Sequence, residues 1–194
     1  MSQITIVQGH PDPRGDRYCH ALAEAYVDGA NGNRHQTRRV EIAKLEFPLL
    51  ESQDDYESGN TPPALLEAQS NLLWADHYVI VYPLWLGTMP AKLKGFLEQV
   101  FRPDIAYEKS ESGQAWTKLL KGKSARIIVT MGMPAPVYRW YFGAHGLKNL
   151  ERNILGFVGV KPIRSTLIGM VEGMSQEKRQ RWLGNVKALG SRGH

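Results

Sequence analysis

Short apolar runs and longer stretches of helical periodicity alternate along this chain. Runs of strand length predict five strands, at residues 4–8, 35–42, 77–82, 125–130 and 160–168. Apolar residues at helical spacing predict five helices, at residues 16–30, from 62 to about 73, at 90–101, at 136–157 and from a Ser175 cap to about 189. A strand and a helix repeated five times are typical of an α/β protein with a three-layer, doubly wound, five-stranded parallel sheet.

The residues between these segments refine the prediction. The sequence Asn31-Gly32-Asn33 closes the first helix, while Gly143 and Gly146 interrupt the helical pattern at 136–157. Residues 43–61 show no clear period, so we expect a loop there. No internal repeat, low-complexity tract or linker divides the chain, which predicts a single domain over residues 1–194.

The composition is that of a globular protein, with 42% hydrophobic and 22% charged residues. No apolar run is long enough to span a membrane, so we expect no direct membrane insertion. The first residues enter a strand pattern without the features of a signal peptide, and the chain has one cysteine, Cys19. A single cysteine cannot form an internal disulfide and agrees with a reducing compartment, so a cytoplasmic location is expected.

The net charge of +5 has little predictive value by itself. The basic residues are scattered and accompany no nucleic-acid motif, so we expect no nucleic-acid partner. A solvated basic surface is the simplest interpretation, and an anionic small ligand is also compatible with it. No metal site is predicted.

Three unusual segments follow the predicted strands, at residues 9–19, 83–90 and 131–146. In open α/β sheets, ligands bind beyond the carboxyl ends of the strands, where the connections diverge. We therefore expect these three loops to meet and to form a ligand site.

The first loop precedes a helix, whose free N–H groups and dipole favour a phosphate. Arg14 and Arg17 add positive charge, and Gly15 lets the backbone approach a ligand closely. The loop matches neither the dinucleotide nor the Walker motif. The alternative is a plain strand-to-helix turn, with Asp16 as the N-cap of the helix.

The other two loops carry aromatic and polar side chains. A planar ring could pack against Trp85, although Trp85 could equally cover an edge of the core. Gly132 allows a backbone N–H to approach a ligand, and Tyr138 and His145 could donate to a carbonyl that gains charge during reduction. The alternative for His145 is a structural histidine on a helix.

Taken together, these loops resemble the NAD(P)H quinone reductase family of flavodoxin-like proteins. The strongest motif is Tyr82-Pro83-Leu84-Trp85 with the following block from Met89 to Phe101. His10-Pro11, Thr130-x-Gly132, Tyr138 and His145-Gly146 also match the family series, and the resemblance covers most of the chain.

The resemblance implies the flavodoxin-like strand order 2-1-3-4-5 and a flavin, FMN or FAD, bound across all three loops. NAD(P)H would give a hydride to the flavin and leave, and a quinone-like acceptor would then take the hydride from the same face. Tyr138 and His145 would stabilise charge on the reduced ring or the acceptor. The residues implied for flavin binding are His10, Arg14, Asp16, Arg17, Tyr18, Cys19, Pro83, Leu84, Trp85, Leu86, Gly87, Thr130, Met131, Gly132 and Tyr138.

This chain also departs from the family pattern. Leu86 and Gly87 replace a Trp and a Phe, which predicts a more open acceptor pocket. Asp16 and Cys19 stand where relatives carry Ser and Asn in the phosphate loop. One more residue separates Tyr138 from His145 than in the long members of the family.

Two other functions fit a flavodoxin-like protein. One is an electron carrier without enzymatic activity, but such carriers are typically acidic and have a Ser/Thr-rich phosphate loop. The other is a flavin-binding ancillary or regulatory subunit of a membrane transporter. Members of the family usually form homodimers, and Trp140, Tyr141 and Phe142 could lie on such an interface or inside the protein.

Overall fold

The computed structural model describes residues 1–109 and 115–193. Its strands are β1 Gln3–Gln8, β2 Gln36–Glu41, β3 His77–Pro83, β4 Tyr107–Lys109, β5 Trp116–Lys118, β6 Ser124–Thr130 and β7 Ile163–Ile168. Its α-helices are α1 Tyr18–Asn31, α2 Gln53–Ser58, α3 Leu66–Trp74, α4 Ala91–Val100, α5 His145–Lys148, α6 Gly156–Val158 and α7 Gln176–Arg192. Helical turns of other types lie at η1 Ile42–Lys44, η2 Pro63–Leu65, η3 Val137–Tyr141 and η4 Asn149–Leu155.

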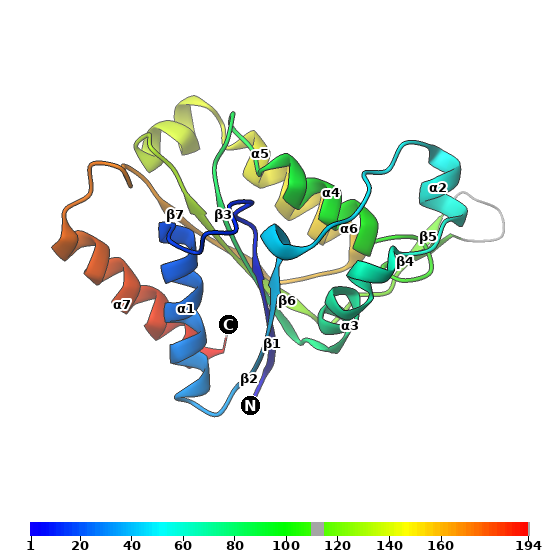
Figure 1. The fold of residues 1–194 in the computed structure, drawn as a ribbon, viewed down its shortest axis with the longest axis horizontal. Coiled ribbons are helices and arrows are strands. Elements are labelled where there is room, and N and C mark those ends of the chain that lie inside the picture. The colour runs from blue at the N-terminus through cyan, green and yellow to red at the C-terminus, as the bar shows by residue number, and fades with distance from the viewer. Residues whose placement is uncertain (110–114, 194) are drawn as a thin grey trace.

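Five parallel strands form the main sheet in the order β2-β1-β3-β6-β7. This order confirms the predicted flavodoxin-like topology, because β6 and β7 are the fourth and fifth strands of that sheet. The register pairs Gln8 with Val81 and Pro83 with Thr130, so the strands end at a common edge. The loops after β1, β3 and β6 therefore start side by side, at the top of the sheet in Figure 1.

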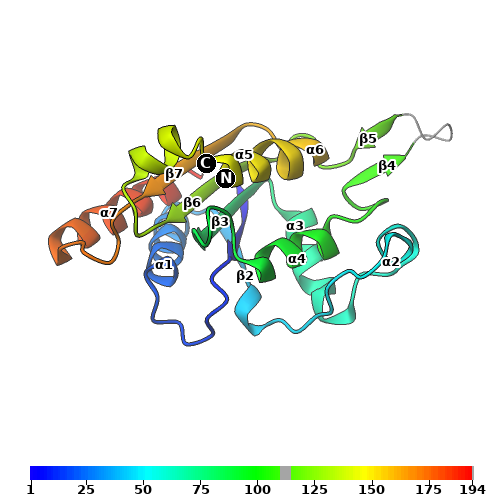
Figure 2. The same ribbon diagram turned by 90° about the horizontal axis from the view of Figure 1, so that it is seen from above.

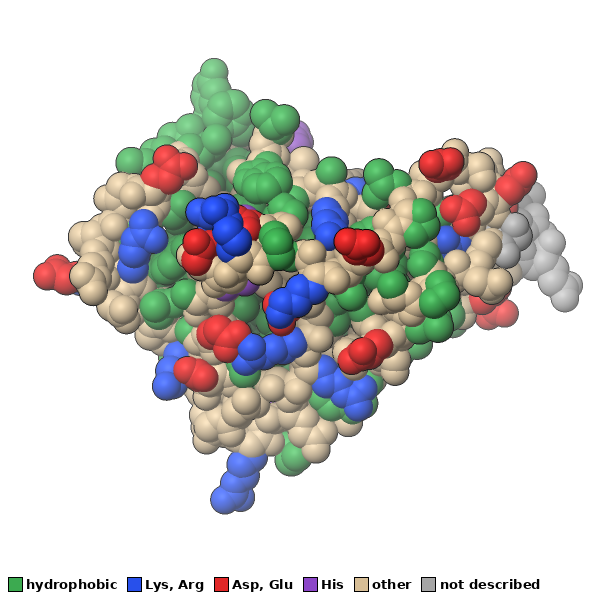
Figure 3. Space-filling view, in the orientation of Figure 1, with side chains coloured by type: hydrophobic (Ala, Val, Ile, Leu, Met, Phe, Trp, Pro, Cys, Tyr) green, Lys and Arg blue, Asp and Glu red, His purple; other side chains and the backbone are tan. Residues whose placement is uncertain are grey.

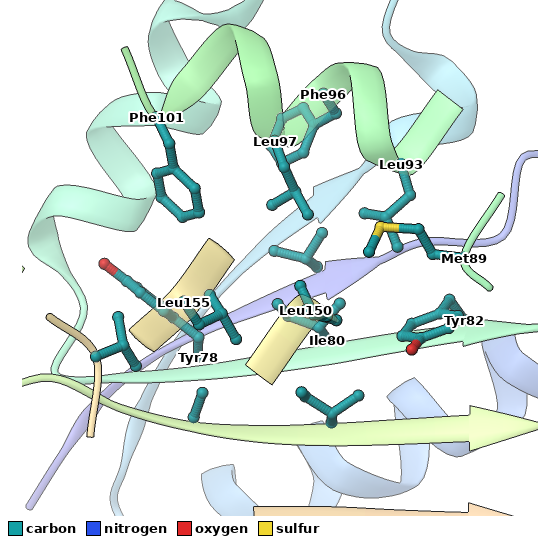
Figure 4. Close-up of a cluster of buried hydrophobic side chains, with 14 of the residues drawn as sticks. Tyr78, Ile80, Tyr82, Met89, Leu93, Phe96, Leu97, Phe101, Leu150 and Leu155 are labelled. Carbon is teal, nitrogen blue, oxygen red and sulfur yellow. The ribbon is translucent and has the colours of Figure 1, made fainter. Parts of the chain in front are cut away.

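The helices form one layer on each face of the sheet. Figures 1 and 2 show α1 and α7 side by side on one face, with α3, α4 and the segment from α5 to α6 over the other. Alternate residues of β3 supply the two cores: Tyr78 and Ile80 face α4, while Val79 packs with α1. Figure 4 shows Leu93 and Leu97 of α4 directed at this strand. Alternation of this kind explains why the run at 77–83 is apolar at nearly every position.

Helices α1 and α7 approach one another very closely. A Cβ at Gly29 of α1 would clash with the carbonyl group of Lys187, and a Cβ at Gly190 of α7 would clash with that of Tyr26. Glycine at both positions therefore lets the two backbones come into contact. The first and last helices of the described chain are joined along their length.

The helical pattern at 136–157 is not one helix. It is divided into η3, α5, η4 and α6, and the chain turns between η3 and α5. The predicted break at Gly143 is confirmed, since Gly143 and Ala144 both have positive φ values, 64° and 49°. The predicted break at Gly146 is wrong, because Gly146 lies inside α5. Its missing side chain serves close packing instead.

The loop expected at residues 43–61 contains a short helix, α2. Ser52 is its N-cap, and the Ser52 hydroxyl accepts a hydrogen bond from the backbone N–H of Asp55 (3.0 Å). The helix has six mainly polar residues, too few to show an apolar period. The antiparallel pair of β4 and β5 was also not predicted, since each strand is three residues long. Among the described residues, no helix is long and apolar enough to cross a membrane.

Candidate functional site

The three strand-end loops touch one another directly. The imidazole of His10 in the first loop lies edge-on to the indole of Trp85 in the second, with ring centroids 5.9 Å apart. Tyr138 of the third loop donates its hydroxyl hydrogen to the carbonyl oxygen of Gly87 (3.2 Å). The Cys19 Sγ lies 3.1 Å from the hydroxyl oxygen of Thr130, which joins the start of α1 to the end of β6. The predicted convergence of the loops is therefore present.

The first loop is organised around Asp12. Its carboxylate accepts hydrogen bonds from the backbone N–H of Arg14 (3.1 Å) and from the Arg14 side chain (2.6 Å at the shortest). The Arg17 guanidinium donates to the same carboxylate at 2.8 Å. The hydrogen bonds from Arg14 lower the pKa of Asp12, so the carboxylate stays charged. Two cations thus share one anion at this loop.

The N-cap of α1 is Arg17 and not Asp16, which corrects the sequence prediction. The Asp16 side chain is 60% exposed and forms an ion pair with Arg17 at 3.3 Å instead of capping. The first turn of α1 carries no acidic residue and no side-chain cap, so its positive end remains available to an anion. Gly15 has a φ of 76°, and a Cβ there would meet no atom within 4 Å.

His10 is buried and neutral in this arrangement. Its Nδ1 accepts a hydrogen bond from the backbone N–H of Asp12 (3.1 Å), which leaves the proton on Nε2. Burial and the neighbouring His20, whose ring centroid lies 5.6 Å away, lower the pKa of His10. His10 therefore shapes the loop and contacts Trp85 without carrying a charge.

The second loop reverses direction in a tight turn from Trp85 to Thr88. The backbone N–H of each of these residues donates to the carbonyl of the other, at 2.9 and 3.0 Å. Leu86 and Gly87 between them both have positive φ values, 47° and 81°. The turn projects outward, because the Leu86 side chain is fully exposed and Trp85 is 48% exposed. Trp85 is therefore not simply a cover for the core.

Tyr138 connects the second and third loops. Its side chain is buried, and its hydroxyl oxygen accepts a hydrogen bond from the backbone N–H of Leu147 (3.1 Å) while donating to Gly87. Burial raises the pKa of Tyr138. To donate to a ligand, this phenol would first have to release Gly87. In this geometry the phenol joins the backbone of the turn to the backbone of α5.

A hollow lies between the turn and α5. It has a volume of about 440 Å³, within the roughly 300–1,000 Å³ of small-molecule sites. Its lining residues are Leu86, Gly87, Thr88, Met133, Tyr138, Phe142, His145 and Gly146. His145 is exposed at the start of α5, and its side chain forms no hydrogen bond or ion pair within the described parts of the chain. Its imidazole is therefore available to a ligand.

At Gly146, α5 comes very close to the turn at one side of this hollow. A Cβ there would clash with the carbonyl oxygen of Gly87 and lie 2.7 Å from Cα of Thr88. Glycine is thus required for α5 to reach the turn. Exposed aromatic side chains border the same end of the molecule, with Trp140 and Tyr141 76% and 82% exposed. Figure 3 shows hydrophobic side chains gathered there.

Several residues assigned to the site from the sequence face the protein interior. The Tyr18 hydroxyl donates to the carbonyl of Arg179 (2.9 Å), and Met131 is buried in the core. Cys19 is also buried, and burial raises the pKa of its thiol to about 12. A ligand at this loop would meet the backbone of Cys19 and not its sulfur.

Backbone groups of the remaining candidates anchor the loops. Pro83 is the last residue of β3, and the N–H of Leu84 donates to the carbonyl of Thr130 (2.7 Å). Gly132 is exposed, with the Glu172 carboxylate beside it. Of the candidates, Leu86, Gly87, Tyr138 and His145 line the hollow, while Arg14, Asp16 and Arg17 lie apart from it in the first loop.

Sequence reasoning overlooked four residues of the site, Asp12, Thr88, Met133 and Phe142. The Asp12-x-Arg14 spacing was the one available signal, since an aspartate can fold back onto an N–H two residues ahead. Met133 and Phe142 join the hollow only because the chain turns at Gly143. No group of three or more His, Cys, Asp and Glu side chains is placed to hold a metal ion within residues 1–109 and 115–193.

The residues present fit a flavin nucleotide. The first loop gathers guanidinium donors from Arg14 and Arg17 and the Arg14 backbone N–H around one anion, the Asp12 carboxylate, and such donors are of the kind that bind a phosphate. A Cβ at Gly15 or Gly87 would meet nothing within 4 Å, so the backbone is open to a ligand at both loops. The apolar hollow lined by Leu86, Met133 and Phe142 suits a planar ring.

Comparison with known proteins supports the same interpretation. Residues 2–189 match the family described as having a flavodoxin-like fold. The chain is 30% identical over 178 residues to a ribosyldihydronicotinamide dehydrogenase-like protein of Penicillium crustosum, covering 79% of this chain and 64% of the relative. It therefore spans less than two thirds of that protein.

Two further proteins match over nearly their whole length. An FMN-dependent NADH:quinone oxidoreductase of Bacillus anthracis is 25% identical, with 99% of this chain and 100% of the relative covered. The structure of an NAD(P)H:quinone oxidoreductase from Methanothermobacter marburgensis has a TM-score of 0.77 at 21% identity, covering 97% of this chain and 95% of the other. At that identity the structural match concerns the fold.

Proposed function

The chain belongs to the family of proteins with a flavodoxin-like fold, and from this we propose that it is a flavin-dependent NAD(P)H oxidoreductase that reduces quinones or similar acceptors. The observation that carries the proposal is the convergence of three strand-end loops, which meet through the His10–Trp85 ring contact and the Tyr138–Gly87 hydrogen bond. The second and third of these loops line the hollow. The named relatives point to the same activity.

Some residues of the site would bind the flavin, and others would act in the reaction. The loop from His10 to Arg17 and the start of α1 would hold the phosphate, while the turn from Trp85 to Thr88 would hold the ring. A bound flavin supplies the acceptance and donation of hydride. His145 would hold a proton or hydrogen bond beside the group that gains charge, because its imidazole is exposed and lines the hollow. Tyr138 would fix the turn against α5.

We propose FMN as the flavin, since the Bacillus anthracis relative is named as FMN-dependent. The sequence left FMN and FAD open, and the relative's name favours FMN with NADH as the donor. The cytoplasm remains our proposed location, with Cys19 as a buried thiol. The single domain expected over residues 1–194 also remains a proposal.

We further propose a homodimer formed through the aromatic end of the molecule. Trp140, Tyr141 and Phe142 are at least half exposed, although one of the two alternatives placed them in the interior, and Phe142 lines the hollow. Exposed aromatic side chains in one place mark interaction surfaces. Sedimentation of wild-type protein and a Trp140→Glu variant tests this, and a monomeric wild type would contradict it.

The function is tested by spectroscopy of the purified protein. We expect a flavin absorbance spectrum that is bleached by NADH or NADPH and restored by a quinone. Bleaching without reoxidation by a quinone, nitro or azo compound would favour an electron carrier or an ancillary subunit of a transporter. A protein that neither carries nor takes up a flavin would refute the proposal.

A further inference from the structure

The loop before α1 supplies its own anion. Asp12 is only 15% exposed at its side chain, although it lies in a surface loop, and it accepts from two arginines and one backbone N–H. The side chains of Arg14 and Arg17 are 65% and 40% exposed. Among the described residues, the carboxylate nearest to each of them is that of Asp12. In Figure 3, basic and acidic side chains lie side by side over this loop.

This arrangement has a cost for an incoming phosphate. The donors that suit a phosphate are already engaged by Asp12, so binding must either displace the carboxylate or tolerate its charge. Like charges at contact distance oppose one another even in water. Asp16 provides a contrast, because it lies on the same loop, is 60% exposed and contacts only Arg17 at 3.3 Å.

We propose that Asp12 is an internal competitor for the flavin phosphate: it holds Arg14 and Arg17 together in the unliganded loop, and the phosphate must displace it from them. This inference rests on the proposed function, since it assumes that the loop binds the phosphate of a flavin. Asp12 is then a residue that sets how strongly the protein prefers a phosphorylated flavin over an unphosphorylated one.

The test compares FMN with riboflavin in an Asp12→Asn variant. Asparagine keeps the carbonyl oxygen that accepts from the Arg14 N–H, so the turn is preserved while one negative charge is removed. Dissociation constants are measured by flavin fluorescence quenching with flavin-free protein, for wild type, Asp12→Asn and the control Asp16→Asn. We expect Asp12→Asn to tighten FMN by roughly five- to thirtyfold, with riboflavin unchanged and a smaller effect for Asp16→Asn.

Three other results would contradict the proposal or the function on which it rests. Weaker FMN binding by Asp12→Asn would mean that Asp12 preorganises the arginines for the phosphate, and the proposal would be wrong. If Asp12→Asn and Asp16→Asn changed FMN affinity equally, the effect would come from net charge alone, and the specific role of Asp12 would be refuted. Failure of wild type to bind either FMN or riboflavin would instead overturn the proposed function. A second measurement is the rise in melting temperature on adding inorganic phosphate, which should be larger for Asp12→Asn than for wild type.

Discussion

Replacing Tyr138 by phenylalanine removes one hydroxyl and leaves the ring in place. That hydroxyl forms two hydrogen bonds, one to the Gly87 carbonyl at 3.2 Å and one from the Leu147 N–H at 3.1 Å. Gly87 lies on an exposed turn, so water can replace the lost donor there at little cost. Leu147 is buried, and an unsatisfied buried N–H costs about 1–3 kcal/mol. We expect Tyr138→Phe to lower the free energy of unfolding by about 2 kcal/mol.

The assay is urea unfolding of the flavin-free protein, together with steady-state kinetics of the flavin-loaded protein. A loss of this size corresponds to a melting temperature lower by about 4–8 °C in a chain of this length. Because Tyr138 holds the turn, flavin affinity should also fall, while kcat at saturating flavin should change by less than about threefold. Tyr141→Phe is the matched control, since Tyr141 is 82% exposed and should change neither quantity.

One result would refute this reasoning. If Tyr138→Phe unfolds like wild type but loses more than about 100-fold in kcat, the phenol acts in the chemistry and releases Gly87 during turnover. The buried arrangement described here would then be a resting state.

Three further experiments test other parts of the molecule. His145→Ala should lower kcat by about 100-fold or more with flavin content unchanged, whereas Lys148→Ala on the exposed side of α5 should have no effect; loss of flavin would assign His145 to binding. Gly146→Ala should destabilise the protein by about 1–3 kcal/mol, because the new Cβ meets backbone atoms of the turn. Gly184→Ala in α7, where a Cβ meets no atom within 4 Å, should stabilise the protein by about 0.5–1 kcal/mol. If Gly146→Ala and Gly184→Ala changed the free energy of unfolding in the same direction, the packing argument would be wrong. Cys19 should resist iodoacetamide at pH 8 in the native protein and react fully in urea, since burial raises its pKa to about 12; rapid native labelling, followed by mass spectrometry, would show that the thiol is accessible.

The sheet could be predicted from the sequence because its strands are covered on both faces. The run from His77 to Pro83 is buried at every position, so the apolar signal is continuous and strong. Parallel strands also need long crossovers, which fixes where the loops lie. The same rule identified the loops that carry Trp85 and His145.

Details that depend on side-chain packing could not be predicted. Tyr138 is buried and Tyr141 is exposed, although both are tyrosines in the same helical segment. The partners of the Tyr138 hydroxyl are Gly87, which is distant in sequence, and Leu147, which lies beyond the chain reversal at Gly143 and Ala144. The engagement of Arg14 and Arg17 by Asp12 likewise depends on loop geometry, since sequence alone gives only their proximity along the chain.

The contact between α1 and α7 has a consequence for synthesis of the chain. About 145 residues separate Asn31 from Gln176, so the ribosome completes the first of these helices long before the second. At about 5–20 residues per second, α7 is synthesised roughly 7–30 s after α1. During that time the α7-facing side of α1 is uncovered in the nascent chain, and the hydrogen bond from the Tyr18 hydroxyl to the Arg179 carbonyl can form only after α7 has emerged.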